Sequence, residues 1–240
     1  MANGTVQVTL NFMGVPVRSD FPRRVHTGEI DPGRSHEYAL AESFFELPLT
    51  ALSIEVLERY AELSTPELYL PFLPHTEKLF ERLLAPFKSA KRCYCLGEFL
   101  AAIELCAHVA EMLAQLVWEM EPLSKNPEER SEEVERAFFG RTFEKLGQEH
   151  RIRILAVTKR VPEDHVEAFT YLRTTRRKYF HLWDENIDEI QNDALAAFKS
   201  VNSLVQGILQ ISVSSEEPGK VVVNPTLSRY LDRVRPPVDK

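Results

Sequence analysis

The residues best suited to chemistry in this sequence lie in the stretch LRTTRRKYFHLW, residues 172–183. It contains an arginine and a histidine that are separated by four residues, Arg176 and His181. Imidazole titrates near neutral pH and can take or give a proton, whereas guanidinium offers a planar fork of donors to a phosphate group. These two residue types are the ones needed for acid–base chemistry at a phosphodiester.

Helical geometry gives the arginines of this stretch a second interpretation. Arg173 and Arg176 fall on the same helical face as the apolar residues Val166, Phe169, Phe180 and Trp183. A guanidinium group in an apolar contact is costly unless it is paired or hydrogen-bonded. The sequence therefore predicts a partner, which is a carboxylate, a dimer mate or a ligand phosphate. Candidate carboxylates are Glu98, Glu104 and Glu111.

The position of His181 does not by itself join it to Arg176. Five residues correspond to about 140° around an ideal helix, so the two side chains lie on different faces. The simplest alternative is an arginine in a structural ion pair and a histidine in solvent. Helix geometry leaves both interpretations open.

The elements that position these residues are mainly helical. One apolar stretch, residues 89–119, has two neighbouring apolar stripes at helical spacing, and we expect it to be the central helix. Helices are also expected at about 50–63, at 73–85 before Pro86, from Val134 to Leu146 or Leu155, from Pro162 to Trp183, and at 190–211. Residues 5–12 alternate as a strand that could pair with a second strand in KVVVNP, and the tail after Pro225 is expected to be extended.

Composition and charge set limits on function. The chain has 44% hydrophobic residues, 27% charged residues and a net charge of −7, which is typical of a globular domain rather than a general nucleic-acid coat. We see no apolar run of about 18 residues and no secretory signal, so we expect a cytoplasmic protein with no membrane partner. Cys93, Cys95 and Cys106 lack metal-site spacing and are expected to be free core thiols, although the cations beside Cys93 and Cys95 could make these two reactive.

Metal binding has one weak signal. Glu104, His108 and Glu111 are spaced by four and three residues and line one side of the central helix. A di-iron bundle needs a Glu-x-x-His element and a second copy on another helix, and neither is present in the sequence. We therefore expect no metal and no cofactor.

Three segments together resemble a known family. SAKRCYCLGEFLAAIELCAHVAEMLAQLVWEM resembles the first long helix of HEPN domains, in particular an uncharacterised bacterial branch found in defence and toxin-like proteins. LRTTRRKYFH resembles the later helix that carries an arginine, four to six residues and a histidine, and DALAAFKSVNSLVQGIL resembles the closing helix. The resemblance covers residues 86–212.

The resemblance implies a function and a set of roles. Catalytic members of the family form dimers and cleave RNA without a metal, so His181 would act as general base or acid and Arg176 would stabilise charge on the phosphate. Arg173, Arg177 and Lys178 would bind flanking phosphates, and Tyr179 would stack on a base. A toxin-like member would also have an antitoxin-like protein partner. Nucleases of the family usually have a small polar residue where this chain has Arg177.

The sequence therefore predicts an all-α, HEPN-like up-and-down helical bundle over 86–214, with an N-terminal extension over 1–85, a C-terminal tail over 215–240 and a short two-stranded β-ribbon. The functional expectation is a homodimeric, metal-independent endoribonuclease. Two alternatives stay open at this point. One is a non-catalytic HEPN dimerisation or RNA-binding module, and the other is a helical scaffold whose N-terminal region binds another protein.

Overall fold

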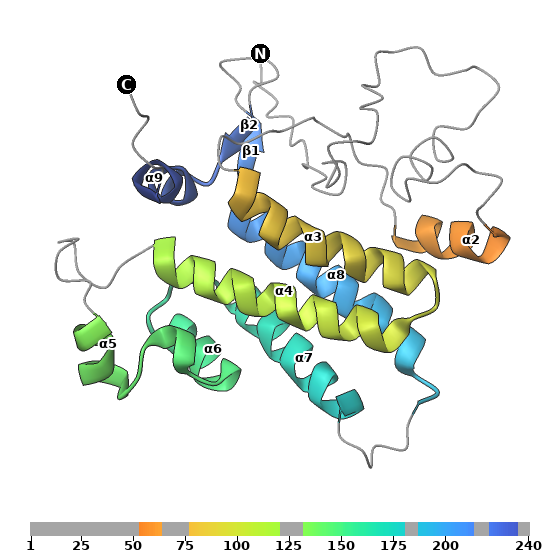
Figure 1. Cartoon of the computed structure of the whole chain (residues 1–240), viewed down its shortest axis with the longest axis horizontal. Helices are drawn as coiled ribbons and strands as arrows, with labels where there is room; N and C mark the ends of the chain where they lie inside the picture. The colour runs from red at the N-terminus through yellow and green to blue at the C-terminus, as the bar shows by residue number, and fades with distance from the viewer. Residues whose placement is uncertain (1–52, 64–76, 121–131, 181–186, 214–220, 235–240) are drawn as a thin grey trace, which may run out of the picture.

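The chain folds into an all-α, up-and-down helical bundle, as the sequence predicts. The structure is a computed structural model that describes residues 53–63, 77–120, 132–180, 187–213 and 221–234. Its long helices are α3 (Glu77–Cys95), α4 (Phe99–Met120), α7 (Glu163–Phe180) and α8 (Ile190–Leu209). They lie side by side and alternate in direction along the chain (Figure 1).

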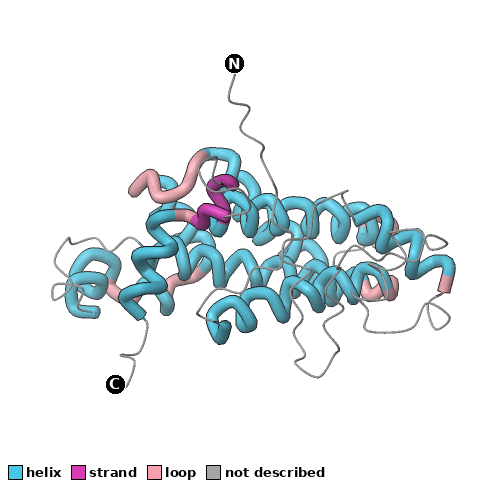
Figure 2. The backbone as a smooth tube through the Cα atoms, turned by 90° about the horizontal axis from the view of Figure 1, so that it is seen from above, coloured by secondary structure: helices cyan, strands magenta, loops and turns pink. Residues whose placement is uncertain are grey.

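Shorter elements surround these four helices. They are α2 (Ile54–Leu63), α5 (Glu132–Phe139), the 3-10 turn η4 (Phe143–Lys145), α6 (Gln148–Val157), α9 (Pro225–Val234) and the strands β1 (Gln210–Val213) and β2 (Val221–Val223). Figure 2 shows that helices dominate the part of the chain that the structure describes, with the two strands as a short ribbon.

The central position of α4 is confirmed. This helix packs against α3, α6, α7, α8 and α9. Both predicted stripes are buried along most of its length, in the residues Ala102, Ile103, Cys106, Ala107, Val109, Ala110, Leu113, Ala114, Leu116 and Val117. By length and composition α4 could also cross a membrane, contrary to the sequence expectation that no segment has this character, and core helices of globular proteins share that property.

The start of the central helix differs from the prediction. The expected helix over 89–119 is divided at Gly97, whose φ of +84° turns the chain back and makes α3 and α4 a helical hairpin. Leu96 and Leu100, which were predicted to continue the buried stripe, are 59% and 43% exposed at this turn. The expected helix end before Pro86 is also wrong. The helix α3 continues through Pro86, and the buried Phe87 packs against Phe198 of α8.

A second glycine divides the next predicted helix. The chain expected to be helical from Val134 to Leu146 or Leu155 forms α5, the turn η4 and α6 instead. Gly140 adopts a φ of +71° just after α5. One side chain fixes this corner, because Glu135 accepts hydrogen bonds from Trp118 Nε1 (2.7 Å) and from the backbone N–H of Phe143 (2.8 Å). The rings of Trp118 and Phe143 stack with centroids 4.5 Å apart.

The helix that carries the candidate motif and the closing helix begin where the sequence predicts. The helix α7 begins at Glu163, directly after Pro162, and α8 buries the predicted stripe that includes Ala194, Val201 and Leu204. Ile211 belongs to β1 rather than to α8. The last part of the predicted motif helix, including His181 and Trp183, lies outside the described residues.

The C-terminal segment is more ordered than the sequence suggests. The strand β2 pairs antiparallel with β1 instead of residues 5–12, which lie outside the described part of the chain. The tail after Pro225, expected to be extended, forms α9. Leu227 is fully buried, and Tyr230 donates a hydrogen bond to Glu119 of α4. These contacts hold α9 to the bundle, whereas the proposed division of the chain at 85/86 and 214/215 stays a prediction.

Candidate functional site

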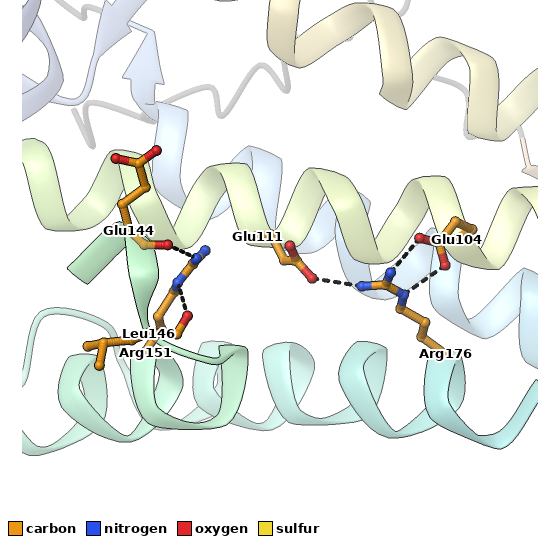
Figure 3. A network of polar contacts seen from close by, with 6 residues as sticks. All are labelled: Glu104, Glu111, Glu144, Leu146, Arg151 and Arg176. Atoms are coloured by element: carbon orange, nitrogen blue, oxygen red, sulfur yellow. Dashed lines mark hydrogen bonds and ion pairs between the residues drawn. The ribbon is translucent and has the colours of Figure 1, made fainter. Parts of the chain in front are cut away.

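Arg176 is held by two carboxylates of the central helix (Figure 3). Its Nε donates to Glu104 Oε2 and its Nη2 contacts Glu104 Oε1, both at 2.7 Å, while Nη1 donates to Glu111 Oε1 at 2.8 Å. Glu104 and Glu111 lie seven residues apart, so two turns of α4 present them on one face. Of the three kinds of partner that the sequence left open, Arg176 has the carboxylate, supplied by two of the three candidate glutamates.

The charge of this cluster is negative. One guanidinium and two carboxylates sum to −1 at neutral pH, and all three guanidinium nitrogens have a carboxylate partner. The side chains are 36%, 35% and 29% exposed for Arg176, Glu104 and Glu111, so water and salt screen the pairs in part. In this arrangement the fork of Arg176 points to carboxylates and not to an open phosphate site.

Arg173 makes a similar contact one helical turn earlier. Its Nη2 donates to Glu149 Oε2, near the start of α6, and the Arg173 side chain is 19% exposed. Arg173 and Arg176 therefore connect α7 to two different helices, α6 and α4. Both arginines of the predicted apolar face have the partners that their position demands.

Lys178 and Tyr179 of the motif helix contact α8 and the turn before it. Lys178 Nζ lies 2.9 Å from Asp193 Oδ2 and 3.1 Å from Glu189 Oε2, and the Tyr179 hydroxyl donates to Asp193 at 2.6 Å. Burial acts to raise the pKa of Asp193, but hydrogen bonds from Tyr179 and Lys178 outweigh it and hold the pKa below its usual value. Hydrogen bonds to Asp193 and Glu189 raise the pKa of Lys178.

Two of the six predicted site residues are not brought into this network. Arg177 is exposed and makes no polar contact with any residue that the structure describes. His181 lies outside the described residues, so its position relative to Arg176 stays a prediction. Arg173, Arg176, Lys178 and Tyr179 thus each make polar contacts that connect α7 to its neighbours, which are α6, α4 and α8.

The possible metal ligands serve other purposes. Glu104 and Glu111 bind Arg176, and His108 is exposed on the same helix. Within the described ranges, no three His, Cys, Asp or Glu side chains converge as a metal site.

The cysteines are core residues, with Cys95 and Cys106 buried and Cys93 half-buried. Burial raises the pKa of all three thiols, to about 12 for Cys95. The neighbouring cations Lys91 and Arg59 act in the opposite direction on Cys95 but are outweighed. These thiols are therefore poor nucleophiles at neutral pH.

One anchoring residue gave no signal in the sequence. Arg151 donates to the backbone carbonyls of Glu144 and Leu146 and so holds the turn η4 against α6 (Figure 3). Its partners are main-chain atoms, which carry no residue type that a sequence pattern could reveal. The role of Arg151 is therefore to hold the backbone of the turn η4 in place.

The structure is thus an all-α, up-and-down helical bundle in which ion pairs connect α7 to its neighbouring helices. Compared with protein-family models, with curated proteins and with solved structures, the chain matches none.

Proposed function

We propose that this chain is a non-catalytic, HEPN-like helical bundle that works as a homodimer in the cytoplasm. The observation that carries the proposal is the pairing of Arg176 with Glu104 and Glu111. The HEPN-like character rests on the resemblance of residues 86–212 and is consistent with an up-and-down bundle.

The carboxylate pair opposes phosphate chemistry at Arg176. An RNA phosphate that approached this guanidinium would meet a cluster with a net charge of −1 and would have to displace two carboxylates. A hydrogen bond between charged groups contributes about 1.5–3 kcal/mol, so freeing the fork carries a substantial cost. Arg176 is better explained as a link between α7 and α4.

Exposed apolar side chains support the homodimer. Leu100 and Phe180 are 43% and 50% exposed, and Leu96 and Ile187 are 59% and 67% exposed. They lie in segments that meet at one end of the bundle, where α4 begins, α7 ends and α8 begins (Figure 1). Exposed apolar side chains at one end of a bundle are candidates for a protein contact surface. We assign this surface to a second copy of the chain because it borders α7, the helix with the motif, and because catalytic members of the family that the chain resembles form dimers.

Sedimentation equilibrium of the full chain tests the homodimer. We expect a dimer for the wild type and a monomer for Phe180→Asp, because a buried charge at the contact has no partner. Phe138→Asp is the matched control, since Phe138 is 74% exposed on α5, away from the proposed contact. A monomeric wild type, or equal effects of both substitutions, would contradict the proposal.

The second candidate function is the metal-independent endoribonuclease with Arg176 and His181. The observation in its favour is exposure: the Arg176 side chain is 36% exposed, and the neighbouring Arg177 is exposed as well. In this case RNA would be the substrate, with an antitoxin-like protein as regulator.

RNA cleavage in the presence of EDTA separates the two candidates. We expect no cleavage by the folded wild-type chain. Cleavage that leaves 2′,3′-cyclic phosphate ends, and is lost in both His181→Ala and Arg176→Ala, would establish the ribonuclease instead. Glu135→Gln serves as the control for nonspecific loss of structure, because Glu135 holds the corner after α5 and makes no polar contact with the predicted site residues that the structure describes.

A further inference from the structure

A pocket of about 210 Å³ lies at the end of the bundle where α4 and α8 end and where α7 and α9 begin. Apolar residues form much of its wall, namely Val117, Met120, Val161, Pro162 and Ile208. The polar residues that line it are Arg160, His165, Asn224 and Thr226. This pocket is remote from the apolar end assigned above to the dimer, so it is independent of the proposed function.

The described lining of the pocket includes a cationic side chain, Arg160. The whole sequence has a net charge of −7, but none of the lining residues that the structure describes is Asp or Glu. The guanidinium of Arg160 lies 4.0 Å from the ring of Trp118, and its Nη1 donates to the Trp118 carbonyl at 3.0 Å. These contacts fix a permanent positive charge at the wall. Glu163 and Asp164 are exposed and lie outside the lining.

His165 is the group in this pocket whose ring has no structural task that the described residues reveal. Its backbone N–H is bonded to Pro162 O and Asp164 Oδ1, but neither ring nitrogen makes a hydrogen bond within the described part of the chain. The Nδ1 atom is buried without a partner. A buried polar atom without a partner costs about 1–3 kcal/mol, so an imidazole in this state points to a missing partner.

Gly207 makes room for this imidazole. A Cβ atom at Gly207 would lie 2.3 Å from His165 Nε2 and 2.5 Å from Cε1, which is too close for any side chain. The absence of a side chain on α8 therefore allows the Nε2 edge of the ring to reach the pocket wall. Glycine inside a helix is less favourable than alanine by roughly 0.5–1 kcal/mol. Gly207 therefore lowers the stability of α8 slightly but leaves space for the imidazole.

Two helix starts add partial positive charge. Pro162 precedes α7, and Asn224 caps α9 by accepting a hydrogen bond from the N–H of Thr226 at 2.9 Å. The amide of Asn224 also donates to the carbonyl of Ile208 at 3.1 Å, which fixes this corner to α8. The positive ends of both helix dipoles therefore lie at the pocket, where they favour an anion.

We propose that this pocket binds a small organic anion, with a carboxylate or phosphate group near His165 and Arg160 and a short aliphatic part against Val117, Met120 and Ile208. The volume equals that of about seven water molecules, at roughly 30 Å³ each. It lies below the roughly 300–1,000 Å³ of drug-sized ligand sites, so the ligand has few atoms. The guanidinium supplies charge and donors, the imidazole supplies a hydrogen-bonding ring edge, and the apolar residues face the aliphatic part of the ligand.

NMR titration of the full chain tests the ligand class. The imidazole signal of His165, assigned by its loss in His165→Gln, is followed during addition of butyrate, butyl phosphate or butanol. We expect saturable shifts with at least one anion and none with butanol at the same concentration. The anion that binds more tightly identifies the preferred head group. Equal binding of butanol, or no shift with any of the three, would overturn the proposal.

Variants test the site independently of the signal. Isothermal titration with the preferred anion should give about tenfold weaker binding for His165→Gln, the factor expected for one lost hydrogen bond to a charged group. Gly207→Ala should weaken binding at least as much, because its methyl group displaces the ring. His150→Gln is the matched control, since His150 is exposed on α6. If Gly207→Ala fails to fold, His165→Gln alone decides, and unchanged binding in that variant rejects the site.

Discussion

At the scale of single residues, the helix α7 shows how charge on an apolar face is accommodated. Arg173 and Arg176 lie on the side that faces neighbouring helices, and each reaches an acidic side chain on a different one. The side chains are 19% and 36% exposed, so each is largely covered while its guanidinium group is paired. Position on the apolar face therefore predicts a structural partner more directly than it predicts catalysis.

Arg176→Ala should lower the free energy of unfolding by about 1–3 kcal/mol, because it leaves two neighbouring carboxylates without their shared cation. Urea denaturation measures this loss. Arg177→Ala is the matched control. It removes the same side chain type one residue away, from an exposed position that has no polar contact with the described residues, and should change stability by less than about 0.5 kcal/mol. Equal effects would show that the carboxylate contacts contribute nothing.

The cysteines give a second prediction at this scale. Because burial raises the pKa of Cys95 to about 12, its thiolate fraction at pH 8 is about one in ten thousand. Cys95 and Cys106 should therefore react with iodoacetamide only after unfolding, whereas the half-buried Cys93 should react first in the native protein. Mass spectrometry of partly alkylated protein checks the order. Native-state labelling of Cys106 before Cys93 would contradict it.

At the scale of elements, apolar periodicity predicts which segments are helices but not where the chain turns. The stripes of α4 and α8 were predicted because their buried residues follow one helical spacing. The breaks at Gly97 and Gly140 were missed, since a glycine in a helix costs only about 1 kcal/mol and its left-handed alternative is selected by packing. The helix α9 was missed as well, because its burial of Leu227 depends on a distant helix.

Gly97→Ala should destabilise the α3–α4 hairpin by about 1–2 kcal/mol, since an L-residue is strained at a φ of +84°. The new methyl group would also lie 3.4 Å from Nη1 of Arg59, which donates to the Cys95 carbonyl at the end of α3. Gly147→Ala is the control, because that glycine has a φ of −64° and open space at its Cβ position. Thermal unfolding of both variants measures the difference, and equal melting temperatures would refute the role of Gly97.

At the scale of the whole molecule, the polar contacts of the motif helix were predictable only in part. Glu104 and Glu111 were among the candidate carboxylates for the arginines because they lie on the helix predicted to be central. The partner of Arg173 was not, because the position of Glu149 depends on the break at Gly140 that creates a separate α6. Tertiary contacts that cross a misplaced turn cannot be read from local spacing.

The buried core of the bundle predicts a loss of stability in alkali. Burial raises the pKa of Cys95 and Cys106, and it also raises the pKa of Tyr94, together with a hydrogen bond to Glu62. Below about pH 9 these groups are protonated in both states. Above it the unfolded thiols lose protons that the folded ones keep, so the unfolded state is favoured as pH rises.

Stability should therefore fall from about pH 9 upward, by up to roughly 1.4 kcal/mol per pH unit for each buried thiol until its folded-state pKa is reached. Urea midpoints at pH 8, 9 and 10 under reducing conditions measure the slope. The double variant Cys95→Ala, Cys106→Ala should have a lower midpoint at pH 8 but a shallower decline, because its side chains do not titrate. An identical slope in the two proteins would show that the thiols do not couple folding to pH. The decline in stability would then belong to Tyr94 or to the Lys178 contacts, because the pKa values of Tyr94 and Lys178 are raised as well.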